Sequence, residues 1–263
     1  VVYNNFFKRD RNFKVEKSDD ILRIGMLGDS ITFGAGIANP KDRFSDTLQK
    51  NLQENRINAE VYNLGVTGLD SHEEIKLYRD LSFLNFDIVV WQYYLNDIQP
   101  EDKGEPAKII SQDAYPNDFV KRLTKISTFF DFIYWRFSSK YTTTFNNLGS
   151  HYLDLYNNEE VINNHEGELS DFINELKKEN KEIVVIIFPF IELIGPNYPD
   201  FIHKEMTAFF NSHGIEVIDL LEDLKNSNWR NLVASKFDTH PNEKVHRIAA
   251  EKLYEKIYPK SIQ

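Results

Sequence analysis

Residues 21–30 read ILRIGMLGDS, an apolar run that stops at a glycine, an acid and a serine. A short apolar run bounded in this way is typical of a buried β-strand. An amphipathic segment follows at 42–54, where Phe44, Leu48 and Leu52 recur every four residues and predict a helix. The run therefore begins a strand, turn and helix unit that has Ser30 at its turn.

Strands and helices continue to alternate along the chain. We expect strands at 59–64, 87–93, 183–188 and 215–218, and helices at 71–83, 170–179, 200–212 and 241–258. A capping box at Ser71-His72-Glu73-Glu74 is expected to begin the helix at 71. Strands that alternate with helices form a parallel sheet covered on both faces. The sequence therefore predicts an α/β protein, a three-layer α/β/α sandwich with a parallel five-stranded sheet.

Two segments depart from this alternation. Residues 1–20 are polar, charged and aromatic without a clear period, and we interpret them as an N-terminal arm before a single domain at 21–263. Residues 100–168 form an aromatic-rich, largely helical insertion between the third and fourth strands, with the run FFDFIYWRF at 129–137. These aromatics are expected either to pack the insertion onto the sheet or to form a lid or acyl-binding wall.

Composition restricts the classes of function. A net charge of -10 argues against a nucleic-acid partner. The absence of cysteine excludes disulfides, thiolate metal sites and cysteine nucleophiles. The sequence contains no run of about 18 apolar residues, so it does not predict a membrane span. Because the sequence opens at Val1, membrane anchoring by an upstream segment stays open.

Several common motifs are absent. The serine lies in GDSIT (28–32), which does not match the G-x-S-x-G elbow of α/β-hydrolases. The sequence has no P-loop, no dinucleotide fingerprint after Gly34 and no H-E-x-x-H zinc motif. Nucleotide-dependent and zinc-dependent chemistry of these kinds is therefore not indicated.

Ser30 and His240 are the candidate nucleophile and base. Ser30 follows the first strand at the edge where parallel sheets bind ligands, although a serine there is also a common helix cap. A serine nucleophile needs a base, and the base needs an acid that orients it. His240 lies just before the last helix, with Asp238 two residues earlier, and Pro241 suits the first position of that helix. The alternative is that Asp238 or His240 only caps the helix.

Two further loops offer donors for an oxyanion. The segment NLGVTG (63–68) follows the second strand, and its glycines allow a backbone N–H to approach a ligand closely. The segment LND (95–97) follows the third strand and offers the amide of Asn96. Each loop is also an ordinary turn signal. All four segments lie at strand ends or at the start of the last helix, so we expect them to share one site.

These four segments resemble the motifs of the SGNH (GDSL-like) hydrolase family, in the family's order and over nearly the whole chain. The resemblance implies an SGNH, flavodoxin-like fold and a serine esterase that needs no cofactor and no metal. It implies Ser30 as nucleophile, His240 as base, Asp238 as the orienting acid, and an oxyanion hole made by Ser30, Gly68 and Asn96. Asp29, Asp97 and Tyr94 are expected to support the site.

Two positions depart from the family's pattern. Tyr94 lies where the third motif commonly has glycine, which predicts a narrower pocket. The spacing between Asp238 and His240 is two residues, where many members have three. The segments LND and DTHPN are similar to those of envelope-associated members, so a cell-envelope or extracytoplasmic location is favoured over a cytoplasmic one.

The expected partner is an ester substrate, either an O-acylated glycan or a lipid or short acyl ester. Three alternatives stay open. An O-acyltransferase would use the same triad with a different acceptor. A non-catalytic glycan- or lipid-binding module would result if Tyr94 blocks turnover. A metal-dependent phosphohydrolase would use Asp29, Asp97, Asp238 and His240.

Overall fold

A computed structural model describes residues 3–6, 8–98, 118–127, 130, 150–235 and 238–258. The chain divides into two compact units, Val1–Asp97 with Asn164–Gln263 and, separately, Ile98–Asn163. Within the second unit α5 (Asp118–Ile126) is helical. The aromatic run predicted at 129–137 lies outside the described residues, apart from Phe130. Its two expected roles are therefore not addressed by the structure.

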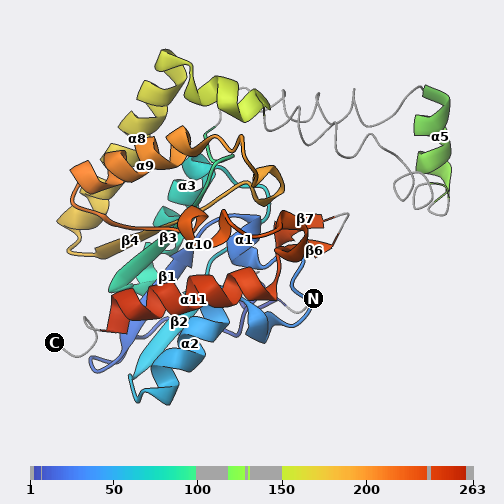
Figure 1. Ribbon diagram of the computed structural model, residues 1–263. Helices are drawn as coiled ribbons and strands as arrows, with labels where there is room; N and C mark the ends of the chain where they lie inside the picture. The colour runs from blue at the N-terminus through green and yellow to red at the C-terminus, as the bar shows by residue number, and fades with distance from the viewer. Residues whose placement is uncertain are drawn as a thin grey trace. The chain divides into compact units, whose positions relative to one another are not determined.

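A parallel sheet of five strands lies at the centre of the first unit, in the order β2-β1-β3-β4-β5 (Figure 1). From β1 the chain passes to β2 on one side and later to β3 on the other, with Leu27 opposite Trp91. Ligands bind where strand order reverses in this way. The fold predicted from the sequence is confirmed. The strands are β1 Leu22–Leu27, β2 Ala59–Asn63, β3 Ile88–Tyr94, β4 Glu182–Phe188 and β5 Glu216–Asp219.

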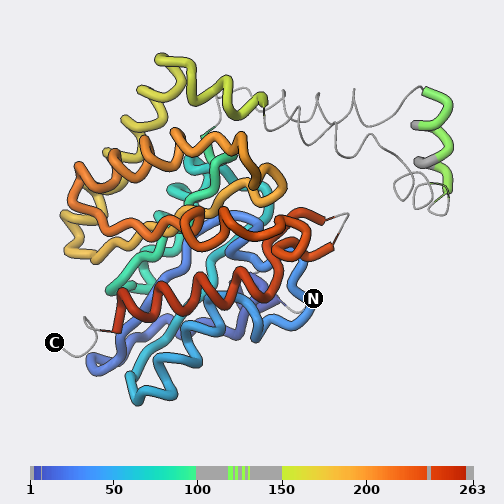
Figure 2. The backbone as a smooth tube through the Cα atoms, viewed as in Figure 1, coloured from blue at the N-terminus to red at the C-terminus, as the bar shows by residue number. Residues whose placement is uncertain are grey.

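One face of the sheet is covered by α2 (Phe44–Glu54) and α11 (Glu243–Ile257), which lie side by side in Figures 1 and 2. Their apolar side chains recur at helical spacing, and Leu48 and Leu253 are fully buried. These residues form one core with alternate strand side chains such as Val90. Burial of apolar area on this scale is the main favourable term in folding.

The other face is covered by α3 (Ser71–Leu81), α9 (Asp200–Ser212) and the sheet-facing part of α8 (Glu159–Lys178). Aromatic rings fill this layer. The buried Trp91 ring packs edge-on against a ring from α8 and a ring from α9, Phe172 and Phe210. Offset and edge-to-face packing of this kind adds to simple area burial.

Short elements connect these layers at the carboxyl edge of the sheet and elsewhere. A two-stranded antiparallel ribbon joins β6 and β7 just before α11. The short elements are α1 Ser30–Phe33, η1 Pro40–Asp42, η2 Ser82–Leu84, η3 Ile191–Leu193, α10 Leu221–Leu224, η4 Trp229–Asn231, β6 Val233–Ser235 and β7 Asp238–Pro241.

The capping residues of two helices differ from the sequence prediction, although α3 begins at Ser71 as expected. Asp70, not Ser71, caps α3, because its side chain accepts a hydrogen bond from Glu73 N at 3.0 Å. Pro241 is not the first residue of the last helix, since it ends β7. Asn242 caps α11 instead and accepts from the N–H groups of the second and third helical residues. Asparagine and aspartate are both strong N-cap residues, so either is a sufficient start signal.

The N-terminal arm is integrated into the first unit. Phe13 is buried and stacks on Tyr62 of β2, with ring centroids 4.3 Å apart. Arg9 donates to Gly34 O at 2.6 Å and to Ile37 O at 2.7 Å. These contacts attach the arm to the segment that follows α1. No helix in the described part of the chain is long and apolar enough to cross a membrane.

Candidate active site

The turn from β1 into α1 presents Ser30 at its first helical position. Asp29 is the N-cap, and its Oδ1 accepts from Ile31 N at 2.9 Å. The serine is therefore not needed as the cap, which leaves its hydroxyl available for other contacts. At Gly28 a Cβ would lie 2.3 Å from Thr32 Oγ1 and 2.5 Å from Gln92 Oε1, so only glycine fits the close approach of this turn.

Gln92 holds the turn from the neighbouring strand. Its Oε1 accepts from Asp29 N and Thr32 N, each at 3.2 Å, and from Thr32 Oγ1 at 2.9 Å. Asn63 at the end of β2 holds the other side, because its Nδ2 donates to Thr32 O at 2.5 Å. Sequence reasoning did not single out Gln92. The signal was a lone polar residue inside a buried strand, which has to be hydrogen-bonded.

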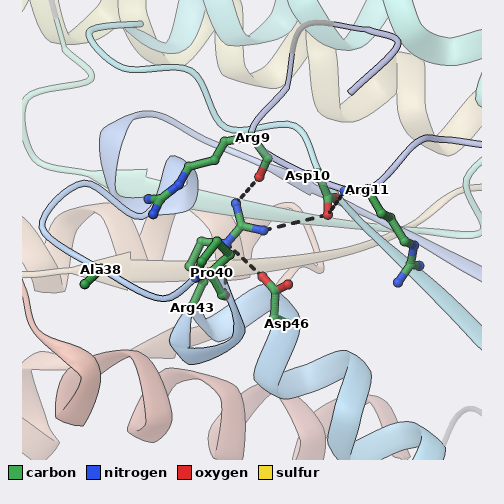
Figure 3. A pocket seen from close by; sticks show the side chains of 7 residues that line it. All are labelled: Arg9, Asp10, Arg11, Ala38, Pro40, Arg43 and Asp46. Carbon is green, nitrogen blue, oxygen red and sulfur yellow. Dashed lines mark hydrogen bonds and ion pairs between the residues drawn. The ribbon is translucent and has the colours of Figure 1, made fainter. Parts of the chain in front are cut away.

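Arginine side chains contact the chain around and after α1. A pocket of about 460 Å³ is lined by Arg9, Arg11, Arg43, Asp10, Asp46 and two small residues (Figure 3). Arg43 is 1% exposed, donates to Arg9 O and pairs with Asp46 at 2.8 Å. The guanidinium groups of Arg9 and Arg43 thus already have protein partners. We interpret the pocket as part of the scaffold behind α1.

His240 lies on β7 with both ring nitrogens in contact with predicted site residues. Nε2 lies 3.0 Å from Ser30 Oγ, and Nδ1 lies 2.6 Å from Asp238 Oδ1. Ser30 Oγ also lies 3.4 Å from Asp29 Oδ2, a longer contact. With Nδ1 donating to the carboxylate, Nε2 is the acceptor that faces the serine hydroxyl. This geometry permits proton transfer from Ser30 to His240, and it joins residues that are 210 positions apart in sequence.

The charges around His240 favour its protonated form. Burial lowers the pKa of His240, but the hydrogen bond and charge of Asp238 and the charges of Asp29 and Glu192 raise it, so the net pKa lies above the ordinary value. The hydrogen bond to His240 in turn lowers the pKa of Asp238. Burial raises the pKa of Asp29, against the opposing effect of the Ile31 N–H. An imidazole with this environment is well suited to accept a proton.

Gly68 and Asn96, the predicted oxyanion donors, lie on loops that follow β2 and β3. Gly68 has φ +81°, and nothing lies within 4 Å of the position a Cβ would occupy. Asn96 is half-buried beyond β3. Within the described residues no backbone hydrogen bond uses the N–H of Ser30 or that of Gly68. The Asn96 Oδ1 is buried without a hydrogen-bond partner there, and no hydrogen bond connects Gly68 or Asn96 to Ser30. The two backbone N–H groups lie at the start of α1 and on the loop after β2.

Asp97 and Tyr94 shape the loop that carries Asn96. Asp97 Oδ2 accepts from Tyr94 N at 2.7 Å, which closes the turn. Burial raises the pKa of Asp97 well above its usual value, and the charges of Glu74 and Asp29 add to this. The Tyr94 ring packs edge-on against Phe190, with centroids 5.0 Å apart. Asp97 therefore contacts the backbone of the loop, and Tyr94 packs on the segment after β4.

Two other histidines, one on α9 and one on α11, are buried. His203 is 1% exposed and lies 2.7 Å from Asp219 Oδ1 and 2.8 Å from the Tyr198 hydroxyl. His246 is fully buried, and its Nδ1 accepts from Phe44 N at 3.1 Å. Both side chains lie on the inner faces of their helices. Within the described ranges no group of three His, Cys, Asp or Glu side chains is placed to hold a metal ion.

An α/β/α sandwich with a GDS turn at the end of its first strand is the arrangement of a class of hydrolases. The chain belongs to the GDSL-like Lipase/Acylhydrolase family, whose model matches residues 26–248. The family resemblance noted in the sequence is thereby confirmed. No curated protein matches the chain in sequence.

Several solved structures share the fold at low sequence identity. TesA is 13% identical, with a TM-score of 0.56 over 90% of this chain and 98% of that one. The psychrotrophic esterase EstA from Pseudoalteromonas is 13% identical, with a TM-score of 0.53 over 92% and 100%. Axe2, an acetyl-xylooligosaccharide esterase from Geobacillus, is 16% identical, with a TM-score of 0.56 over 93% and 96%.

Proposed function

We propose that this protein is a serine esterase that hydrolyses carboxylic esters through an acyl-enzyme on Ser30. The observation that carries the proposal is the continuous series of contacts from Ser30 Oγ through His240 to Asp238, at 3.0 and 2.6 Å. Membership of a lipase and acylhydrolase family supports the same chemistry. The reaction as proposed requires no metal and no cofactor.

In the first half of the reaction, Ser30 Oγ attacks the carbonyl carbon of the ester while His240 Nε2 takes the hydroxyl proton. The carbonyl oxygen becomes an oxyanion, for which the Ser30 N–H, the Gly68 N–H and the Asn96 amide are the proposed donors. The tetrahedral intermediate then breaks its bond to the alcohol oxygen. His240 returns its proton to that oxygen, and the alcohol leaves.

In the second half, water replaces the alcohol. The water oxygen attacks the acyl carbon while His240 takes one proton from the water. The same three donors are proposed to stabilise the new oxyanion. The bond to Ser30 Oγ breaks, Oγ regains a proton from His240, and the carboxylic acid leaves. Asp238 keeps the imidazole oriented throughout and stabilises the imidazolium that forms in each half.

For the substrate we propose a short-chain O-acyl ester, with an O-acetylated glycan as the first to test. The described neighbour Axe2 acts on acetylated xylooligosaccharides, and a second neighbour of the same fold is an esterase active on acetylated mannans. A panel of p-nitrophenyl esters of increasing chain length, together with acetylated xylan and mannan, tests this. A preference for long acyl chains would instead favour a lipid ester.

A serine-directed fluorophosphonate probe tests the proposed activity. Native protein should be labelled, and Ser30→Ala should lose both the label and the hydrolysis of p-nitrophenyl acetate, with no change in unfolding temperature. Ser212→Ala, on the outer face of α9, is the matched control and should keep both. Absence of labelling in native, folded protein would refute the proposal and favour a non-catalytic binding module in which Tyr94 closes the site.

A further inference from the structure

A second carboxyl group, that of Glu192, lies close to the proposed base. It belongs to η3, which follows β4 after Pro189 and packs against β7, the strand that carries His240. The side-chain oxygen Oε2 is inaccessible to solvent and has no hydrogen-bond partner within the described residues. An unpaired buried carboxyl oxygen is costly, so its retention calls for an explanation.

Glu192 and His240 act on each other electrostatically. Burial raises the pKa of Glu192 to about 7, while its own backbone N–H and the charge of His240 oppose the rise. In the other direction, the charge of Glu192 contributes to the raised pKa of His240. The group therefore changes charge in the same pH range in which a histidine base becomes active.

The segment that carries Glu192 is held in place from the opposite side. The Tyr198 hydroxyl accepts from Phe190 N at 3.1 Å and contacts His203 Nε2 at 2.8 Å. His203 Nδ1 lies 2.7 Å from Asp219 Oδ1 at the end of β5. This buried chain of contacts fixes both ends of the segment from Phe190 to Tyr198, so Glu192 has a defined position.

We propose that Glu192 is a positioning residue that supports His240 as a second acid, in addition to Asp238. The inference rests on the proposed serine esterase function. When Glu192 is ionised, its negative charge stabilises the imidazolium that forms as Ser30 loses its proton. When it is protonated, that contribution is absent. It acts through space, because no hydrogen bond joins it to the imidazole within the described residues.

Other titratable and charged groups around His240 and Glu192 set the background for the test. Asp29 at the cap of α1, Asp238 on β7 and the buried His246 of α11 interact electrostatically with His240, and Tyr198 interacts with Glu192. Glu243 and Lys244 lie on α11, which packs against β7, and the exposed Arg230 lies on η4, which packs against η3.

The test is the ratio of kcat/KM between wild type and Glu192→Gln as a function of pH. Below about pH 6 both forms lack the charge, so the ratio should be close to 1. It should rise through neutrality and reach about three- to tenfold at pH 8.5, because only the wild type then has a carboxylate next to the imidazolium. Glu192→Asp should recover part of the effect, and Glu222→Gln on α10 should give a ratio near 1 throughout. A ratio that does not change with pH overturns the inference.

A measurement that needs no activity separates this inference from the proposed function. The imidazole resonance of His240, assigned with His240→Gln, is followed by NMR during a pH titration. Its midpoint should move to lower pH in Glu192→Gln, since a negative charge has been removed. An unchanged midpoint in the folded variant refutes the role of Glu192, even if the enzyme is active. A shifted midpoint in a protein that no fluorophosphonate labels supports the electrostatic contact and refutes only the esterase.

Discussion

Asn96 is the one proposed oxyanion donor that is a side chain, and it can therefore be removed without changing the backbone. Asn96→Ala should lower kcat for p-nitrophenyl acetate by about a hundredfold or more, with little change in KM. The reason is that the amide acts on a charge that develops only in the transition state. Steady-state kinetics measure both constants. A wild-type kcat in Asn96→Ala would remove this residue from the site.

Ser30, Asp238 and His240 could be proposed from sequence because their residue types and neighbours limit the choices. Ser30 follows a recognisable strand, and Asp238 and His240 stand directly before a recognisable helix. Glu192 and Gln92 could not be proposed in this way, since their relevance comes from burial and from contacts between distant segments. A glutamate after a strand or a glutamine within one carries no local signal of what it faces.

At the level of elements, the strands were predictable because each is a short apolar run closed by glycine, proline, asparagine or aspartate. The sequence analysis placed residues 159–168 in the largely helical insertion and began a separate helix at Ser170, whereas α8 is continuous from Glu159. Its first half contains Asn163, Asn164 and Gly167, residues of low helix propensity that tertiary contacts override. Strand β7 was missed as well, because a four-residue strand that ends in proline is defined only by its pairing with β6.

The hydrogen bonds that Gln92 of β3 accepts from the start of α1 give a prediction at this level. Gln92→Met keeps the side-chain volume but removes the acceptor shared by Asp29 N, Thr32 N and Thr32 Oγ1. Leaving buried donors unpaired should lower the free energy of unfolding by about 2–4 kcal/mol, as measured in urea. kcat should fall as well, because Ser30 is the first residue of the element that loses its anchor.

A matched substitution on the surface provides the comparison. Gln53→Met changes an exposed position near the end of α2 and should alter the free energy of unfolding by less than about 0.5 kcal/mol. Should Gln92→Met prove as stable and as active as the wild type, the three hydrogen bonds would have no part in holding the nucleophile turn.

For the molecule as a whole, buried titratable groups make stability depend on pH in two opposing ways. Burial raises the pKa of Asp29, Glu74 and Asp97, so the folded state holds protons that the unfolded chain releases above about pH 4. Those groups favour the folded state at low pH. Burial lowers the pKa of His246 to about 3 and that of His165 to about 4, so these histidines favour the folded state at higher pH.

His165 allows one of these contributions to be isolated. Its Nε2 lies 2.9 Å from the Tyr93 hydroxyl, and a glutamine can replace that contact without titrating. Between pH 4 and 6.5 this histidine is protonated in the unfolded chain but stays largely neutral in the folded state, so the wild type loses stability as the pH falls through this window.

The variant His165→Gln should lack that loss of stability. From pH 6.5 to 4 its free energy of unfolding should therefore decline by about 1–3 kcal/mol less than that of the wild type. Urea denaturation at a series of pH values measures the two slopes, and Gln53→Met, at an exposed position on α2, should follow the wild type. Parallel curves for wild type and His165→Gln would mean that His165 is protonated as readily in the folded protein as in the unfolded chain.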